Sequence, residues 1–331
     1  MRALITGIAG FAGNYLAELL LGKGYEVFGA SLENEFKPFL PIDRGAICYT
    51  PINIQDQAGL EHYLSDTRPD LVFHLAAKSS PSQSTKYPQE TFAVNLGGTL
   101  ALLEAIRLRQ IGCRLLLVSS SHVYGSRATG DPDQPVAEDA PLKPESPYAA
   151  SKAAAEMAAY QYWKSYDIHT VTVRAFNHTG AGQGPGFVCP DLARKVVEIE
   201  RGLRPPKLEV ASLDRQIDIS NVRDVVLGYY SALVTSGPAA VYNLCSGRPL
   251  TLRTIAENLI NGSERAISVL PLASESPGRG GRGIIGNGAR ALRDLGWHPA
   301  IPVEDTLREV IEYWRQVGPA SPEPARMVGG E

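Results

Sequence analysis

Tyr148 and Lys152, four positions apart at the start of an alanine-rich segment, could form a proton-transfer pair. Residues i and i+4 share one face of a helix, so Lys152 is expected one turn above Tyr148. A protonated lysine beside a phenol favours the phenolate, so we expect it to lower the pKa of Tyr148 from about 10 toward the range of a general acid or base. Ser120, at the end of an expected strand, could hydrogen-bond the same oxygen. The alternative is a tyrosine that caps a helix and a solvated lysine.

A glycine loop near the start of the chain favours the catalytic interpretation. Gly7, Gly10 and Gly13 lie between an apolar strand and an expected helix. In such a loop the first glycine permits a tight turn, the second lets a pyrophosphate approach the backbone, and the third allows close packing of the helix. The position of the loop favours dinucleotide binding at the helix N-terminus over a simple structural turn.

The end of the second expected strand should distinguish NAD from NADP. An acidic residue there would bind the ribose hydroxyls of NAD, and a nearby arginine would accept the phosphate of NADP. Residues 30–34 (Ala-Ser-Leu-Glu-Asn) carry neither signature. Ser31 can contact a phosphate or a hydroxyl, so we lean slightly to NADP. Asn53 could contact the adenine or cap the helix that follows it.

These residues need a scaffold of alternating strands and helices. The continuous apolar run 71–75 is typical of a parallel strand covered on both faces. The fold class predicted is α/β, a doubly wound parallel sheet of the Rossmann type with a smaller C-terminal substrate-binding domain. We expect strands at 3–6, 26–30, 47–50, 71–75, 114–119, 170–175 and 241–244, and helices at 13–21, 56–66, 92–109, 148–166 and 222–234.

The composition changes after Asn177, where glycine and proline become frequent. We therefore assign 1–176 plus about 215–245 to the dinucleotide-binding domain. Residues of about 177–214 and 246–317 form the predicted substrate domain, and 318–331 a flexible proline-rich tail.

Composition excludes several other classes of protein. The chain has 331 residues, 44% of them hydrophobic, and a net charge of −3, which gives no electrostatic reason to bind nucleic acid or membranes. We find no apolar run of the roughly 20 residues that a membrane span needs. The first strand begins at the N-terminus without a signal peptide, so we expect a cytoplasmic protein. The four cysteines and six histidines are not grouped, so no metal site is expected.

Further motifs resemble the extended short-chain dehydrogenase/reductase family from residue 1 to about 317. They include His74-Leu75-Ala76-Ala77, Asn95 with Gly98-Thr99, Val123-Tyr124-Gly125 and Arg174-Ala175-Phe176-Asn177. The glycine loop and this resemblance together imply cofactor contacts at Gly7, Gly10, Phe11, Ala12, Gly13, Ser31, Asn53, Ile54, Leu75, Ala76, Ala77, Lys78, Asn95, Tyr148, Lys152, Phe176 and His178.

Several stretches are similar to GDP-6-deoxy-4-keto-mannose reductases and to GDP-mannose 4,6-dehydratases. Two are Phe176-Asn177-His178-Thr179-Gly180 and Gly296-Trp297-His298-Pro299. The similarity implies a nucleotide-diphosphate sugar as substrate. The substrate contacts we expect are Ser121, His122, Asn177, Phe187, Val188, Arg215, Arg279 and Arg282.

The residue at position 122 bears on the type of reaction. Dehydratases of this family carry a threonine followed two positions later by a glutamate, whereas here Ser120 is followed by His122. The missing carboxylate counts against dehydration. His122 could still act as a base near neutral pH, but we favour a packed or solvent-facing residue at the strand end.

The family's Arg-Asp-Phe segment reads Ile217-Asp218-Ile219 here, so its nucleotide-holding arginine is missing. Arg215, or Arg279 and Arg282 on a lid, could supply the diphosphate contact instead, because a guanidinium matches phosphate oxygens. The alternatives for the Arg279–Arg282 segment are a disordered loop or a short RNA-binding tract. These changes leave guanine and uracil open as the base.

Taken together, these motifs predict an NAD(P)H-dependent reductase of a nucleotide-linked 4-keto-6-deoxy sugar. The alternatives are a GDP-mannose 4,6-dehydratase, a nucleotide-sugar 4-epimerase and a non-catalytic cofactor-sensing regulator. The resemblance also implies a homodimer built from the helices at 92–109 and 148–166. The small residues of the second helix could instead merely fit the sheet.

Overall fold

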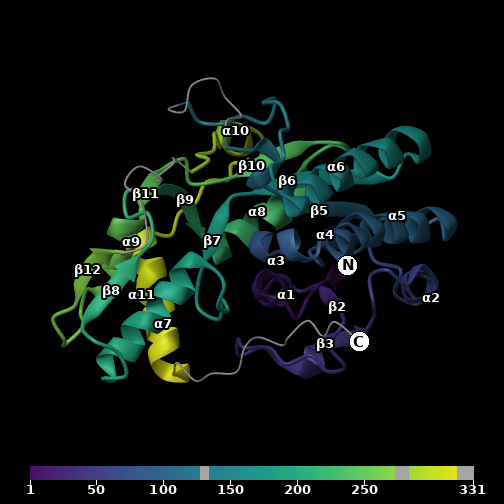
Figure 1. Ribbon diagram of the computed structural model, residues 1–331. Helices are drawn as coiled ribbons and strands as arrows, with labels where there is room; N and C mark the ends of the chain where they lie inside the picture. The colour runs from purple at the N-terminus through teal and green to yellow at the C-terminus, as the bar shows by residue number, and fades with distance from the viewer. Residues whose placement is uncertain (127–133, 273–282, 319–331) are drawn as a thin grey trace.

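The computed structural model describes residues 1–126, 134–272 and 283–318. A seven-stranded parallel sheet crosses the larger part of the molecule (Figure 1). This confirms the predicted fold class. From one edge to the other its strands are β10 (Val241–Leu244), β6 (His169–Ala175), β5 (Arg114–Ser120), β4 (Leu71–His74), β1 (Arg2–Thr6), β2 (Glu26–Ser31) and β3 (Ile47–Pro51).

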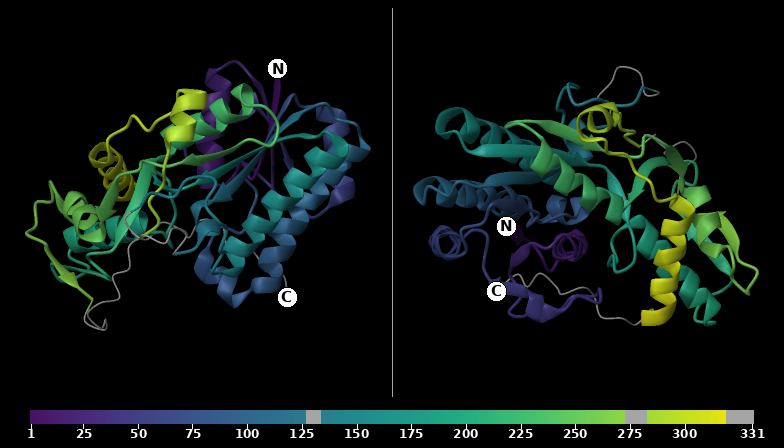
Figure 2. Two further views of the ribbon diagram at one scale, coloured as in Figure 1. Left: turned by 90° about the horizontal axis from the view of Figure 1, so that it is seen from above. Right: turned by 180° about the vertical axis from the view of Figure 1, so that it is seen from behind.

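Helices cover both faces of this sheet, as Figure 2 shows. Alternate strand residues point to opposite faces, so Ile5 lies in one core and Leu4 in the other. The strands are therefore apolar on both sides. One face carries α1 (Phe11–Gly22), α8 (Val222–Thr235) and α10 (Ala289–Leu295), and the other carries α2 (Gln57–Thr67), α5 (Gly98–Leu108) and α6 (Pro147–Tyr166).

The strand order reverses between β1 and β4. The chain fills the sheet outward through β2 and β3, then returns to the other side of β1 with β4, β5, β6 and β10. In sheets of this kind ligands bind in the crevice at the carboxyl ends of the strands beside such a reversal. The loops that follow β1, β4, β5 and β6 are therefore the ones placed to form a site.

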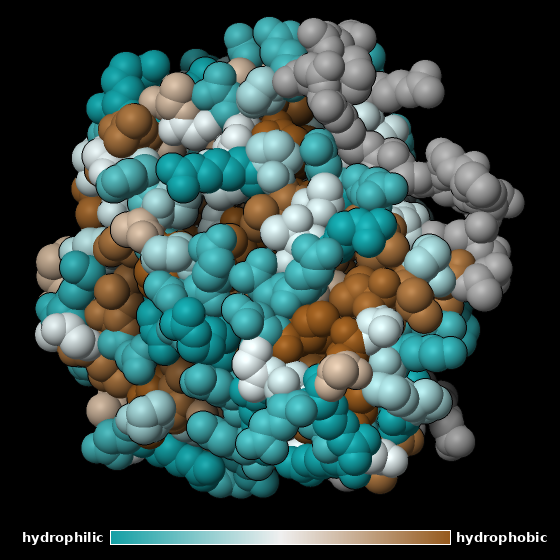
Figure 3. All heavy atoms as spheres, turned by 90° about the vertical axis from the view of Figure 1, so that its left-hand side faces the viewer, coloured by the Kyte–Doolittle hydropathy of each residue, from teal (hydrophilic) through white to brown (hydrophobic). Residues whose placement is uncertain are grey.

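A smaller unit with its own hydrophobic core lies at the left of Figure 1. Figure 3 shows this side of the molecule, where hydrophilic side chains surround separate hydrophobic patches. Of the residues of about 215–245 that we assigned to the dinucleotide-binding domain, β10 pairs with β6 in the large sheet, whereas β9 lies in a sheet of the smaller unit. The domain boundaries stay a prediction. The elements of this unit are β7 (Asn177–Thr179), β9 (Gln216–Asn221) and β11 (Pro249–Thr251) in one sheet, β8 (Lys207–Val210) and β12 (Ser268–Pro271) in another, and the helices α7 (Val188–Glu200), α9 (Leu252–Ile260) and α11 (Val303–Val317).

The helix expected at 92–109 is more complex than the sequence indicated. It consists of α4 (Pro88–Phe92), a π-helical turn η2 (Ala93–Gly97) and α5. This helical run of 21 residues is long and apolar enough to cross a membrane, judged by length and composition alone. We had expected no apolar segment of that length, and this finding corrects the expectation. Half of it is buried, and α5 packs between α2 and α6, so burial in the protein accounts for its composition.

The remaining short elements are η1 (Arg44–Ala46), α3 (Pro81–Lys86) and η3 (Ser121–Tyr124). Of the predicted tail only Gly318, which ends α11, lies within the described residues. Among the residues that the structure describes, no three His, Cys, Asp or Glu side chains are grouped as metal ligands. The absence of a metal stays a prediction.

Candidate active site

The glycine loop connects β1 to α1 and requires glycine at specific positions. Gly7 has a φ of 75°, and a Cβ there would lie 2.8 Å from Ala76 N. A Cβ on Gly13 would lie 2.4 Å from Gly7 O. Side chains at these positions would therefore force the loop apart.

The start of α1 has the chemistry of an anion site. Its N-cap is Gly10, which offers no side-chain cap, and the first turn carries no acidic residue. The first N–H groups of a helix lack intrahelical partners, and the helix dipole favours negative charge beside them. These residues fit the pyrophosphate of a dinucleotide. Asn14, which the sequence analysis missed, braces the loop by donating to Ile8 O at 3.0 Å and Gly10 O at 3.1 Å.

Ser31 is the last residue of β2. Its Oγ accepts a hydrogen bond from Ala9 N at 3.1 Å, which ties β2 to the glycine loop. Asn53 is exposed and its Oδ1 accepts from Gln55 N, while Asp56 supplies the side-chain cap of α2. The suggestion that Asn53 caps this helix was therefore wrong. Ile54 is buried against α5, so its side chain belongs to the core.

The segment Leu75–Lys78 follows β4 and is anchored by the π-helical turn. Asn95, within this turn, accepts from Lys78 N at 2.8 Å and donates to Ser151 Oγ at 2.9 Å. π-turns often occur at functional sites because they redirect a side chain. Here the turn connects the loop after β4 to α6, which carries Tyr148.

Beneath this segment, His74 joins β1, β4 and α5. Its Nδ1 lies 2.8 Å from Thr6 Oγ1 and its Nε2 3.1 Å from Thr99 Oγ1. Burial, with a smaller contribution from Lys152, lowers the pKa of His74 to about 3. The imidazole is therefore neutral at physiological pH and holds the scaffold.

The structure brings Ser120, Tyr148 and Lys152 together at the carboxyl end of β5. Ser146 caps α6 by accepting from Ala149 N at 3.2 Å, which fixes the start of the helix one residue before Tyr148. The Ser120 hydroxyl hydrogen-bonds to the Tyr148 phenol. Lys152 Nζ donates to Val118 O at 2.9 Å, so the lysine is tied to the strand that carries Ser120.

The proton affinity of the phenol differs from our expectation. Burial raises the pKa of Tyr148, and the hydrogen bond from Ser120 opposes this rise in part. The pKa of Tyr148 is therefore raised and not lowered as we expected, because the phenol is 8% exposed and its desolvation is the largest effect. Burial also lowers the pKa of Lys152 to about 8, although Glu156 favours its charged form.

A buried ion pair supports the strand that leads to Ser120. Glu156 lies one helical turn beyond Lys152 and accepts hydrogen bonds from Arg174 Nε at 3.1 Å and Nη2 at 2.8 Å. It also accepts from the hydroxyl of Ser119. The sequence analysis missed Glu156, although its i+4 spacing from Lys152 was a usable signal.

His122 lies in η3, beside the serine and the tyrosine. Its Nδ1 is 3.1 Å from Ser120 Oγ, and its ring meets that of Tyr148 at a centroid distance of 6.0 Å. Burial is the main cause that lowers the pKa of His122, and the positive charge of Arg215 adds to it. The favoured interpretation, a packed or solvent-facing residue at the strand end, did not include this contact with Ser120. Arg215 lies just before β9 of the smaller unit, and its charge acts on His122.

The other expected site residues within the described part of the chain lie in different environments. Asn177 is exposed and donates to Asp218 O at 3.1 Å, which links β7 to β9. Phe187 is 39% exposed where α7 begins. Ser121 and Phe176 are buried, and the ring of Phe176 packs in a small core rather than facing the crevice. Arg279 and Arg282 lie outside the described residues.

His178 contributes a flat surface near the glycine loop. Its ring stacks on Phe11 at 6.2 Å with an interplanar angle of 8°. Nδ1 lies 3.0 Å from Phe176 O, which can only accept, so Nδ1 carries the proton.

Val188, the first residue of α7, packs against the core of the smaller unit.

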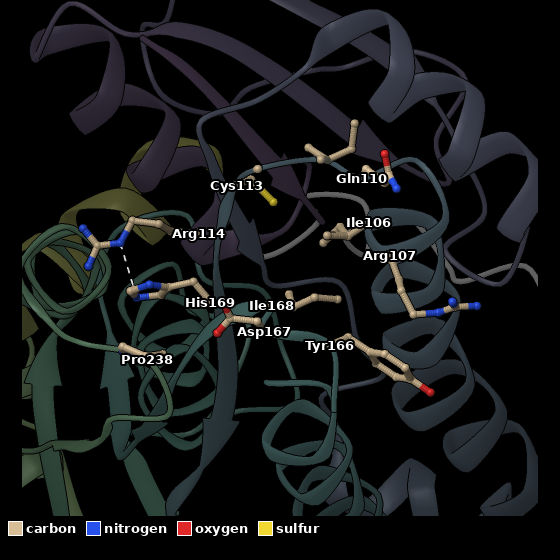
Figure 4. Close-up of a pocket in the computed structure, with 12 residues that line it drawn as sticks. Ile106, Arg107, Gln110, Cys113, Arg114, Tyr166, Asp167, Ile168, His169 and Pro238 are labelled. Atoms are coloured by element: carbon tan, nitrogen blue, oxygen red, sulfur yellow. Dashed lines mark hydrogen bonds between the residues drawn. The ribbon is translucent and has the colours of Figure 1, made fainter. Parts of the chain in front are cut away.

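Figure 4 shows a cavity of about 670 Å³ at the opposite edge of the sheet. Arg114 and His169, the first residues of β5 and β6, line it, with their side-chain nitrogens 3.4 Å apart. None of the predicted site residues lines this cavity. Because ligands of such sheets bind at the carboxyl ends of strands, it does not correspond to the cofactor crevice.

Comparison with known proteins identifies the family. A family model described as GDP-mannose 4,6 dehydratase matches residues 4–310. The chain belongs to this family, among the extended short-chain dehydrogenases/reductases. It is 30% identical over 313 residues to a GDP-6-deoxy-D-mannose reductase from Pseudomonas aeruginosa, covering 95% of this chain and 97% of that protein. It is 27% identical to a GDP-mannose 4,6-dehydratase from Vibrio cholerae, covering 94% of this chain and 92% of that one.

Solved structures of nucleotide-sugar enzymes have the same fold as this chain. RMD from Pseudomonas aeruginosa complexed with NADPH has a TM-score of 0.79 at 27% identity and covers 96% of this chain and 99% of that one. Thermus thermophilus UDP-glucose 4-epimerase in complex with NAD has a TM-score of 0.81 at 29% identity and covers 95% and 99%. The predicted family is confirmed, and the chain is an NAD(P)-dependent nucleotide-sugar oxidoreductase.

Proposed function

We propose that this oxidoreductase reduces a nucleotide-linked 4-keto-6-deoxy sugar, GDP-4-keto-6-deoxy-D-mannose, at C4. The observation that carries the proposal is the hydrogen-bonded Ser120–Tyr148 pair beside Lys152, with an imidazole at position 122 in place of the dehydratase carboxylate. The reductase relative from Pseudomonas aeruginosa supports it.

The state of Tyr148 suits a proton donor. When bound, the nicotinamide supplies the hydride that C4 receives. Burial raises the pKa of Tyr148, so the phenol keeps its proton near neutral pH until negative charge develops on O4. Ser120 holds the phenol by a hydrogen bond and is placed to contact O4. Lys152, tied to Val118 O, provides positive charge beside the site and is the residue we assign to the nicotinamide ribose.

The cofactor that we propose is NADPH. At the end of β2, Ser31 replaces the acidic residue that would bind the ribose hydroxyls of NAD and repel the additional phosphate of NADP. Its hydroxyl is bound to Ala9 N, so the side chain braces the loop and places no negative charge there. The complex of the Pseudomonas relative with NADPH is consistent with this choice.

For the substrate, we propose that Arg215 binds the diphosphate. Ile217 is buried in the core of the smaller unit and cannot replace the missing arginine. Arg215 is exposed, and its charge reaches His122. It therefore lies near the reacting end of the site, where a guanidinium could hold phosphate oxygens. Asn177, Phe187 and Val188 are the residues proposed to line the sugar and nucleotide.

We also propose a homodimer through α5 and α6, in a cytoplasmic protein. Four large hydrophobic side chains on these helices are exposed: Leu108 at 47%, Met157 at 55%, Tyr160 at 49% and Tyr166 at 48%. Association would remove them from water. A dimer mass by light scattering at micromolar concentration would support this assembly, and a monomer would reject it.

The decisive assay is turnover of GDP-4-keto-6-deoxy-D-mannose with NADPH. We expect loss of NADPH absorbance and formation of a reduced sugar, and none of either with Tyr148→Phe. Consumption of GDP-mannose without net NADPH oxidation would instead identify a dehydratase. Tightly bound NAD together with interconversion of C4 epimers would identify an epimerase. Cofactor binding without turnover of any of these sugars would identify a regulator.

A further inference from the structure

Ser120 connects two groups that can carry a proton. Its hydroxyl hydrogen-bonds to the Tyr148 phenol and lies 3.1 Å from His122 Nδ1. The backbone N–H of His122 also donates to Ser120 Oγ at 3.2 Å. A hydroxyl has one donor and two acceptor positions. These three contacts use all of them and form a continuous chain from the phenol to the imidazole.

The direction of this chain can reverse because the serine hydroxyl rotates. With neutral Tyr148, the phenol donates to Ser120 and the serine donates to Nδ1. With a phenolate, Ser120 donates to the tyrosine and a protonated Nδ1 donates to the serine. The same positions of the Tyr148, Ser120 and His122 heavy atoms therefore serve both protonation states of Tyr148 while the proton is transferred.

The far side of the imidazole is the entry point for a proton. His122 is only partly buried, and in the part of the chain that the structure describes no hydrogen-bond partner accompanies its Nε2. The groups that face the ring are Tyr148 from α6, Ser120 from β5, and Arg215 from the segment before β9. No carboxylate contributes to the pKa of His122, which burial and Arg215 lower. The ring is therefore mainly neutral near pH 7, as a relay requires.

We propose that His122 is a positioning residue that returns a proton to Tyr148 through Ser120 after each reduction. This proposal rests on the proposed function, because reduction leaves Tyr148 as a phenolate once it has protonated O4. A proton from water enters at Nε2 as the Nδ1 proton passes to Ser120 Oγ and the serine proton passes to the phenolate oxygen. Each turnover converts the ring from the Nδ1–H to the Nε2–H tautomer. Before the next turnover the ring turns about its Cβ–Cγ bond, Nδ1 takes a proton from water, and Nε2 releases one to water. One solvent proton is consumed for each hydride transferred.

The test compares variants of His122 in the full-length protein. His122→Asn can still hydrogen-bond to Ser120 but cannot relay a proton. We expect its kcat to fall by about tenfold or more with KM for sugar and cofactor unchanged. Its solvent deuterium isotope effect on kcat should rise, because proton return becomes limiting.

Chemical rescue separates a relay from a packing role. His122→Ala should regain kcat in proportion to added imidazole, whereas the wild type and His62→Asn should not respond. His62 lies on the surface of α2, so its substitution is a matched control. Wild-type kcat and isotope effect in His122→Asn, or loss in His122→Ala that imidazole does not restore, would overturn the relay.

The same experiments distinguish failure of the two proposals. Turnover of the 4-keto sugar by the wild type with no His122 effect removes the relay and leaves the reductase. Turnover of GDP-mannose instead removes the reductase, and imidazole rescue is then measured on that reaction, where Tyr148 also exchanges a proton. A protein that consumes neither sugar removes the basis of both.

Discussion

Replacement of Glu156, on α6, by alanine should be strongly destabilising. The side chains of Glu156 and Arg174 are 3% and 6% exposed, and two guanidinium nitrogens bind the carboxylate. Without the carboxylate, Arg174 keeps its bonds to Tyr124 Oη and Glu138 O, both at 2.9 Å, but its charge remains buried and unpaired. Removing one partner of a buried pair costs about 3–5 kcal/mol.

The assay is urea denaturation of the full chain followed by circular dichroism. We expect a lower midpoint for Glu156→Ala with an unchanged slope, which together give the loss of unfolding free energy. The matched control is Glu26→Ala, which breaks an ion pair with Arg2 whose side chains are 45% and 54% exposed. Such a surface pair contributes about 0–1 kcal/mol.

A double variant separates the buried charge from simple loss of packing. Glu156→Leu together with Arg174→Met removes both charges and should cost less than the sum of the two single changes. A loss below about 1 kcal/mol for Glu156→Ala, equal to that of the control, would refute the reasoning. Additive single changes would show that the pair is not coupled.

Four further predictions concern catalysis, stability and cofactor binding. Tyr148→Phe should lower kcat about 100-fold or more with KM and the melting temperature nearly unchanged, measured by NADPH oxidation and thermal unfolding. Burial lowers the pKa of Lys152 from 10.5 to about 8, so the lysine loses its charge as the pH rises through 8. We therefore expect kcat to fall above this pH. Lys152→Arg stays charged and should remove this fall in kcat. Between pH 8 and 10.5 the lysine is protonated in the unfolded chain but neutral in the folded protein. The contribution of Lys152 to the free energy of unfolding should therefore rise with pH over this range. Denaturation of the wild type and of Lys152→Met at several pH values measures it. Gly13→Ala places a Cβ 2.4 Å from Gly7 O and should weaken NADPH binding about tenfold or more by fluorescence titration, whereas Gly22→Ala in the same helix meets nothing within 4 Å and should bind normally.

The sequence predicted the scaffold well where the signals were local. Apolar runs placed the strands, and the glycine spacing placed the turn between β1 and α1. The π-helical turn at Ala93–Gly97 was not predictable, because its residues continue an ordinary helical pattern. The turn is explained by distant partners, since Asn95 binds the Lys78 backbone and Ser151.

The largest error concerned the proton affinity of Tyr148. From the sequence, Lys152 is its nearest charged neighbour and should lower its pKa. In the folded protein burial dominates and raises the pKa instead, while Lys152 itself is drawn to Val118 O. Spacing along a helix gives proximity, but desolvation depends on every element packed around the residue.

By itself the sequence determined the elements and the residue types, since strand and helix periods and the i, i+4 spacing of Tyr148 and Lys152 are local properties of the chain. Only the tertiary structure decided that Ser120 bonds to both Tyr148 and His122, and that Arg174 neutralises Glu156 beneath them. The reason is that hydrogen bonds and burial join residues far apart in sequence, and these set which groups hold a proton.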